Sequence, residues 1–418
     1  MQGTWFFVFV FAVGALIFAF ALFSRPIKAF VSPALPILMV GAGLGAAFPR
    51  PRDELLGTLE ILSWIAVGFG VVGIALRFEL ADLRRLWRPA AAITLAAMAG
   101  MWAIASASLW GLFGLPPLTA LLLGAVVTPT DPVVASSIVT GPFAERRIPA
   151  RLRNLLSLES GTNDGLAFAF VFLPLLLIEH GAAGWGEWLG KTVLWETGVA
   201  AVTGLAAGIA GGMLARCAFA RGGAPGATLL LLALAFTVAV LGLMKAFRTD
   251  SIWAAFVAAL ALAALLPEAR REVANELQEG LVYATMVPAL LVFGMALPWR
   301  AWAEMPPAAV AVAAAVPVLR RLPVILALDR LGGVAAFRHR RDAWVYGWFG
   351  PVGLSAVYYA TIASRRLGAD EIWPVASLLV AASIVVHGAT AAAATRWYAR
   401  ARHAGDARDG GDAKTETM

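Results

Sequence analysis

Two short polar stretches interrupt an otherwise apolar sequence, and their side chains are of the types that bind small cations or protons. The first is TPTDP, with Thr130 and Asp131. The second is ESGTND, in which Ser160, Asn163 and Asp164 have the spacing that places side chains on one face of a helix. Their hydroxyl, amide and carboxylate oxygens suit small hard cations. Burial disfavours the charged form of a carboxylic acid, so such an aspartate can also hold a proton. A group that holds either a proton or a cation is the minimum requirement for their exchange.

The composition predicts that these stretches lie inside a membrane. Of the 418 residues, 60% are hydrophobic and 14% are charged, against about 45–50% and about 25% in soluble domains. A membrane-spanning helix needs roughly 20 apolar residues, and the chain offers about thirteen such stretches. The predicted fold class is therefore an all-α polytopic membrane protein with about thirteen transmembrane helices. The single cysteine, Cys217, excludes a disulfide framework and a cysteine-based metal cluster.

The distribution of charge predicts the orientation. Most of the 33 lysines and arginines fall in loops on one side of the membrane if the N-terminus is outside. The positive-inside rule then predicts an N-terminus outside and a C-terminus in the cytoplasm of a multi-pass cell-membrane protein. The net charge of +7 is thus explained by topology, and we expect no nucleic-acid partner.

The chain is expected to form one transport unit. Residues 1–398 hold all the predicted spans, and residues 399–418 form a short cytoplasmic tail with the composition of a disordered segment. No soluble domain interrupts the spans, so we predict that the protein is not an enzyme and uses no cofactor. Its expected partners are the lipid bilayer and the ions that it moves.

Two of the predicted spans contain helix-breaking residues. Pro129 and Pro132 flank Asp131 in the fifth span, and GWFGPVGLS interrupts the twelfth. Interrupted helices at corresponding positions of two halves are typical of transporters with inverted repeats, whose binding site lies near the middle of the bilayer. We therefore predict inverted repeats with two crossing broken helices. Polar residues that merely hold helices together are the alternative, but that role does not require two acids beside a broken helix.

Glu159 needs a countercharge of its own. It precedes Ser160, and neighbouring side chains on a helix point about 100° apart. The available cations are Arg320 and Arg321 in the eleventh span. Because an unpaired charge at this depth is costly, a structural ion pair is predicted.

Four segments together resemble a known family: TPTDPVVASSIV, LSLESGTNDGLAFAFVF, RRLP and GWFGPVGLS. They resemble the monovalent cation/proton antiporter superfamily, in particular the sodium/proton exchanger branch that carries Asn-Asp in its sixth helix. The resemblance covers nearly the whole chain. It implies electroneutral exchange of one monovalent cation, Na⁺ foremost and K⁺ or Li⁺ as alternatives, for one H⁺. It also implies a homodimer and a role in pH homeostasis.

The resemblance assigns roles residue by residue. Asp164 becomes the carboxylate that binds the cation or the proton, with Thr130 and Asp131 at the unwound crossing beside it. Ser160 and Asn163 support the ligand shell, and Asp131 and Asp164 are the predicted ligands of the transported metal ion. The arginine of RRLP that pairs with Glu159 aligns to Arg320.

One departure from the family pattern concerns the second broken helix. The family usually has arginine in a Gly-Pro-Arg-Gly turn, where this chain has Val352, so a positive charge is missing from the expected crossing. This favours the alternative of a channel or a non-transporting sensor with the same fold. An intramembrane aspartyl protease is a further alternative, since VPALL contains its Pro-Ala-Leu triplet, but its Tyr-Asp and Gly-x-Gly-Asp motifs are absent.

Overall fold

All regular secondary structure of the described residues is helical. The computed structural model describes residues 4–30, 32–131, 141–221, 226–332 and 337–415, and within these ranges there is no strand. In lipid, backbone polar groups must be satisfied internally, which favours helices. The predicted class of an all-α polytopic membrane protein is confirmed.

Within the described ranges, six stretches are long and apolar enough to cross a membrane, and shorter apolar helices accompany them. The count of about thirteen spans stays a prediction. The longer helices are α1 (Thr4–Phe30), α3 (Arg52–Ala75), α4 (Leu80–Gly111), α8 (Ala150–His180), α10 (Ala200–Ala220), α11 (Gly226–Ala246), α13 (Glu268–Met295) and α19 (Ile372–Thr415). The intermediate ones are α2 (Ala34–Ala47), α5 (Pro117–Val126), α12 (Ser251–Leu265), α15 (Pro307–Leu319), α16 (Leu322–Arg330), α17 (Arg340–Trp348) and α18 (Leu354–Leu367). Short helices α7 (Gly141–Glu145), α9 (Gly184–Glu187) and α14 (Trp299–Glu304) lie between them, and Trp188–Val199 is π-helical.

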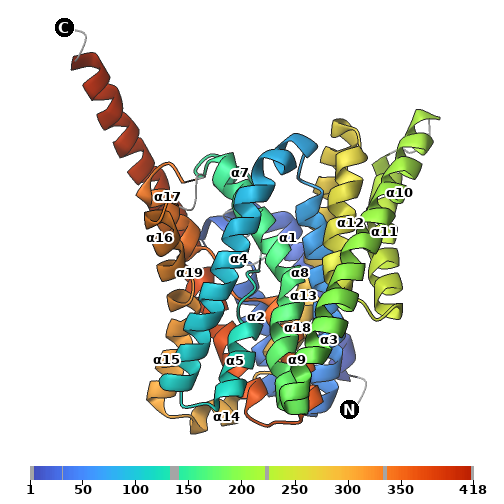
Figure 1. Cartoon of the computed structure of the whole chain (residues 1–418), viewed down its shortest axis with the longest axis vertical. Helices are drawn as coiled ribbons and strands as arrows, with labels where there is room; N and C mark the ends of the chain where they lie inside the picture. Colours follow the sequence, from blue (N-terminus) through green and yellow to red (C-terminus); the bar gives the residue numbers. More distant parts are fainter. Residues whose placement is uncertain (1–3, 31, 132–140, 222–225, 333–336, 416–418) are drawn as a thin grey trace.

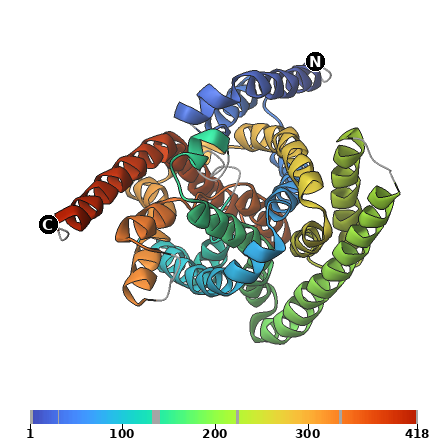
Figure 2. The same cartoon turned by 90° about the horizontal axis from the view of Figure 1, so that it is seen from above.

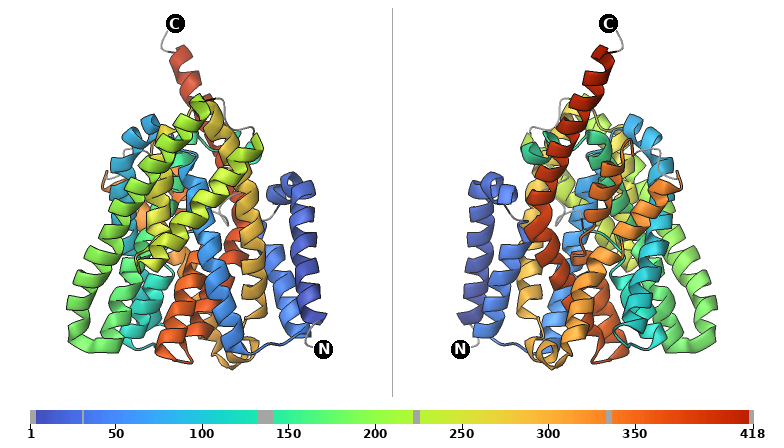
Figure 3. Two further views of the ribbon diagram at one scale, coloured as in Figure 1. Left: turned by 90° about the vertical axis from the view of Figure 1, so that its right-hand side faces the viewer. Right: turned by 90° about the vertical axis from the view of Figure 1, so that its left-hand side faces the viewer.

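The helices form a bundle, and most of them run along its long axis (Figure 1). In the view from above, α10 and α11 lie along one edge of the bundle and α1 along another (Figure 2). The beginning of α1 and the end of α19 lie at opposite ends of the bundle (Figure 3). Helices α8 and α18 carry many buried residues and contact each other inside the bundle.

The last helix extends beyond the bundle. Helix α19 continues to Thr415, through most of the segment whose composition predicts a disordered tail. Its final turns project from the bundle at the end where α7 and α17 lie (Figure 1).

Candidate functional site

The first interruption follows α5. This helix ends at Val126, and the chain is non-helical from there to Asp131. Pro129 has no backbone N–H and disfavours a helical residue before it, which explains the break. The hydroxyl of Thr128 donates to the carbonyl oxygen of Gly124 at 2.8 Å and caps the broken end. Pro132 lies outside the described residues.

The second interruption separates α17 from α18, and it contacts the first. Residues 349–353 are non-helical. The backbone N–H of Asp131 donates to the carbonyl of Pro351 at 2.8 Å. The N–H of Leu354 donates to Oδ2 of Asp131 at 2.7 Å. A carboxylate is favoured at the start of a helix, where backbone N–H groups lack partners. The two broken segments therefore meet through Asp131.

A glycine makes this contact possible. Gly353 precedes the first turn of α18, and a Cβ atom at this position would clash with the carboxylate of Asp131. The sequence GPVG thus supplies both the break and the space for the acid that caps the following helix.

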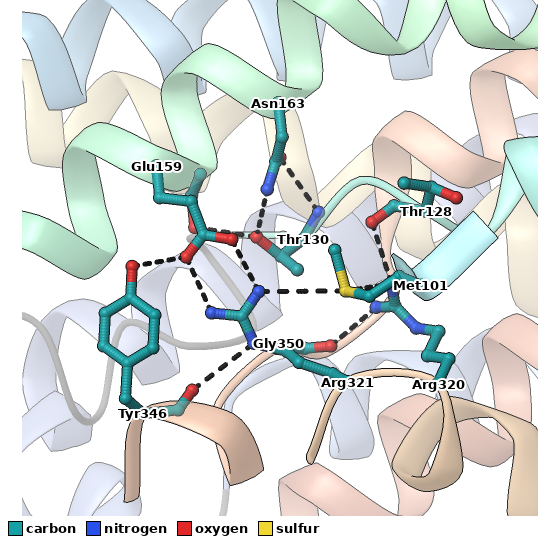
Figure 4. Close-up of polar contacts among 10 residues, drawn as sticks. Met101, Thr128, Thr130, Glu159, Asn163, Arg320, Arg321, Tyr346 and Gly350 are labelled. Carbon is teal, nitrogen blue, oxygen red and sulfur yellow. Dashed lines mark hydrogen bonds and ion pairs between the residues drawn. The ribbon is translucent and has the colours of Figure 1, made fainter. Parts of the chain in front are cut away.

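The predicted polar residues of α8 face the first break. The amide group of Asn163 accepts from the N–H of Thr130 at 3.1 Å and donates to the Thr130 hydroxyl at 2.8 Å. The Ser160 and Thr130 hydroxyl oxygens are 3.0 Å apart. Asn163 and Ser160 thus hold the unwound chain against α8, as Figure 4 shows for Asn163.

Asp164 lies beside Asp131 but has different partners. Its Oδ1 accepts a hydrogen bond from the Ser355 hydroxyl at 2.7 Å, and its backbone carbonyl accepts one from the Tyr359 hydroxyl at 3.1 Å. Sequence reasoning did not assign Ser355 or Tyr359. The available signal was that Ser355 directly follows the Gly-Pro break, in the first turn of the next helix.

A small cavity separates the two aspartates. It is lined by Asp131, Asp164, Leu354 and Ser355, with Ala66, Val67 and Gly70 of α3 on its other side. Its volume of about 10 Å³ is close to the room that one water molecule needs. The cavity can therefore accept one small ion between two carboxylates.

The expected partner of Glu159 is corrected. Arg321, not Arg320, pairs with Glu159, through Nη1–Oε1 at 2.6 Å and Nη2–Oε2 at 2.7 Å. The Tyr346 hydroxyl also donates to Oε2 at 2.6 Å (Figure 4). Both arginines lie at the junction of α15 and α16, where the helix is interrupted. The direction of each side chain therefore does not follow from one continuous helix.

Arg320 instead joins the two breaks. Its Nη1 donates to the carbonyl of Thr128 at 2.8 Å, and its Nη2 donates to the carbonyl of Gly350 at 2.7 Å (Figure 4). The carbonyls at the ends of α5 and α17 carry partial negative charge. Arg320 thus brings a positive charge to the crossing where Val352 removes the one expected from the family pattern. The side chain of Val352 is buried, and its N–H donates to the Ser383 hydroxyl at 2.8 Å.

The buried charges of this region do not balance. Its three acids and two arginines are each at most 4% exposed: Asp131, Glu159, Asp164, Arg320 and Arg321. With every group ionised, this set carries one excess negative charge. Burial of an uncompensated charge is costly, so one proton or one monovalent cation would neutralise the region.

The chain is similar to a known protein family and to several known proteins. The family described as "Sodium/hydrogen exchanger, transmembrane" matches residues 9–397. The chain is 30% identical over 372 residues to "Na(+)/H(+) antiporter 2" of Zygosaccharomyces rouxii, covering 80% of this chain and 45% of that protein. It is 28% identical over 380 residues to a "Na(+)/H(+) antiporter" of Saccharomyces cerevisiae, covering 81% and 37%. It therefore spans less than half the length of these two relatives.

The fold also has a counterpart among solved structures. The sodium proton antiporter MjNhaP1 from Methanocaldococcus jannaschii superposes with a TM-score of 0.70 at 16% identity, over 94% of this chain and 99% of that one. This likeness concerns the fold. Because the family match extends over most of the sequence, the chain belongs to the transmembrane sodium/hydrogen exchanger family.

Proposed function

We propose that the chain is a secondary active antiporter that exchanges Na⁺ for H⁺ across the cell membrane, one for one. The observation that carries the proposal is the single excess negative charge of the buried cluster beside a cavity for one small ion. A proton and a monovalent cation each supply one positive charge. Each can neutralise the cluster, and the cavity between the aspartates has room for one ion at a time. Competition of this kind couples the two fluxes.

In this proposal Asp164 is the carboxylate that alternates between proton and cation. Among the described residues, its side chain accepts a hydrogen bond from Ser355, and it lines the cavity. Asp131 remains charged, because the N–H of Leu354 and the start of α18 stabilise its carboxylate. In the cation-bound state, Asp131 and Asp164 are the metal ligands. Ser160 and Asn163 support this ligand shell by holding the unwound segment against α8 through Thr130.

The remaining assignments follow from family and sequence. The part of the chain up to residue 398 acts as one transport unit, with the N-terminus outside and the C-terminus in the cytoplasm, as the distribution of basic residues favours. The family resemblance supports a homodimer and a role in pH homeostasis. K⁺ and Li⁺ are the alternative cations, since they accept the same oxygen ligands.

The test is transport by the purified protein in liposomes that contain a pH-sensitive dye. Gradients of Na⁺, Li⁺, K⁺ and Rb⁺ are imposed in turn, with protein-free liposomes as the control. We expect a Na⁺ gradient to drive proton movement in the opposite direction, and Rb⁺ to be the weakest of the four. Cation flux without proton movement would indicate a channel, and absence of both would indicate a non-transporting sensor. Either outcome would overturn the proposal.

A further inference from the structure

A basic pocket lies at the end of the bundle from which α19 projects. Its volume is about 280 Å³, and it is formed where the beginnings of α4, α8 and α17 meet α19. Five arginines line it: Arg85, Arg151, Arg338, Arg341 and Arg402. Guanidinium groups bind phosphate oxygens through paired N–H donors.

A single carboxylate, Asp342, lies among the described lining residues, and it is already bound on several sides. Arg151 Nη2 is 2.7 Å from Oδ2, and the backbone N–H of Arg338 donates to the same oxygen at 3.0 Å. The Tyr398 hydroxyl donates to Oδ1 at 2.7 Å. Asp342 is also buried, so it organises the wall of the pocket and offsets one of the five positive charges. The lining keeps a strong excess of positive charge.

An apolar hollow lies farther along two of these helices, α17 and α19. It measures about 380 Å³ and is lined by Trp344, Val345, Trp348, Ala393, Ala394 and Trp397. Trp344 and Trp397 are 43% and 50% exposed. Tryptophan is favoured at the level where lipid headgroups meet acyl chains.

Residues of α17 and α19 line both the pocket and the hollow, and these two helices lie side by side at one flank of the bundle (Figure 1). Arg341 Nη1 donates to the carbonyl of Ala401 at 2.9 Å, and Trp348 Nε1 donates to the Thr390 hydroxyl at 3.2 Å. At a helical rise of 1.5 Å per residue, Ala394 and Arg402 are about 12 Å apart along α19. A charged end and an apolar end at this separation match one phospholipid.

We propose that this flank binds an anionic phospholipid, with its phosphate in the basic pocket and an acyl chain against the three tryptophans. The charge selects an anionic headgroup, since basic pockets between membrane helices attract such lipids. The apolar hollow selects a lipid over a soluble phosphate, which would leave the tryptophans uncovered. This site is separate from the aspartate cavity, and it does not depend on the proposed transport activity.

The experiment measures the thermal unfolding of the delipidated protein in detergent. Phosphatidylglycerol, phosphatidylcholine with the same acyl chains, or glycerol 3-phosphate is added at equal concentration. We expect phosphatidylglycerol to raise the unfolding temperature by several degrees and the other two to have little effect. Equal stabilisation by phosphatidylcholine would overturn the proposal, and full stabilisation by glycerol 3-phosphate would reduce the site to a soluble-anion site.

Variants test the two halves separately. The double change Arg85→Gln/Arg338→Gln removes headgroup charge but leaves the backbone N–H of Arg338 to Asp342, and Trp344→Ala/Trp397→Ala removes the apolar wall. Each should abolish at least half of the phosphatidylglycerol shift. Arg216→Gln and Trp110→Ala, exposed residues on α10 and α4 outside both hollows, are the matched controls. If a double variant folds like the parent and keeps the full shift, the assignment is wrong. Native mass spectrometry of retained lipid gives a second measurement that does not depend on unfolding.

Discussion

Two acids on the same helix differ in how completely they are neutralised. Glu159 and Asp164 are both buried in α8. Glu159 is bound by a bidentate arginine and a tyrosine hydroxyl, whereas the Asp164 side chain accepts from the Ser355 hydroxyl and faces a cavity. A buried acid with a full set of fixed partners stabilises one structure. A buried acid with a space beside it can exchange its countercharge.

The largest expected effect is at the exchanging acid. Asp164→Asn removes the group that alternates between proton and cation, so we expect cation-driven proton movement in liposomes to fall to the protein-free background. The purified variant should unfold at a temperature close to that of the parent. The matched control is Asp370→Asn, whose side chain is 97% exposed and which should transport normally. Retained exchange in Asp164→Asn would refute the role of Asp164.

The next largest effect is expected on the free energy of unfolding, when the ion pair of Glu159 is broken. Glu159→Gln and Arg321→Gln each leave a buried charge without its partner, which costs about 3–5 kcal/mol. Combining them removes both charges, so the double variant should recover part of the loss. Thermal unfolding in detergent measures all three. Additive losses in the double variant would contradict the pairing.

A surface pair supplies the control for that cycle. Arg366 of α18 contacts Glu179 of α8 in the same bidentate manner, with Nε–Oε1 at 3.0 Å, but both side chains are partly exposed. Exposed pairs contribute about 0–1 kcal/mol. Arg366→Gln should therefore change the unfolding temperature much less than Arg321→Gln does.

The difference between Arg320 and Arg321 also marks the limit of prediction from sequence. Composition and hydropathy predicted the helical membrane class, because lipid allows few alternatives. The polar residues of TPTDP and ESGTND were predicted to lie together, and the structure brings them together. Which adjacent arginine meets Glu159 was predicted wrongly, because it depends on the backbone at the α15–α16 junction. Helices α15 and α16 pack against α4, α17 and α19, and contacts between separate helices are not encoded in the local sequence.

At Val352 the sequence showed what is missing but not what replaces it. The sequence indicated that a charge was missing from the second break, but the compensation comes from Arg320, which is distant in the chain. A contact between distant segments has no local sequence signal. The same holds for Tyr346, which completes the partners of Glu159 and was not predicted.

A smaller effect is expected at the hydroxyl beside Asp164. Ser355→Ala removes one hydrogen bond to the carboxylate, and hydrogen bonds to charged groups contribute about 1.5–3 kcal/mol. Because Ser355 also lines the cavity, we expect the Na⁺ concentration for half-maximal exchange to rise about tenfold, with a smaller change in maximal rate. Ser364→Ala on the same helix is the control, since the buried Ser364 hydroxyl has no hydrogen-bond partner among the described residues. Equal effects of the two changes would exclude Ser355 from the ion site.

The smallest expected effect is that of membrane voltage, which should not alter the rate. The buried cluster has one excess negative charge, so its proton-bound and cation-bound forms are both neutral. A cycle that alternates between them moves no net charge. The alternative is that Asp131 also releases a proton, which would move two protons per cation. The Leu354 N–H and the start of α18 oppose this, because they stabilise the charged form of Asp131.

Na⁺-driven exchange is measured in liposomes under a potential set by valinomycin and a potassium gradient, with equal potassium on both sides as the control. A reversal potential that follows the imposed voltage would contradict one-for-one exchange. If Asp131→Asn then removed that dependence while transport continued, Asp131 would be the source of the second proton. Its hydrogen bond to the start of α18 would then have to change during the transport cycle.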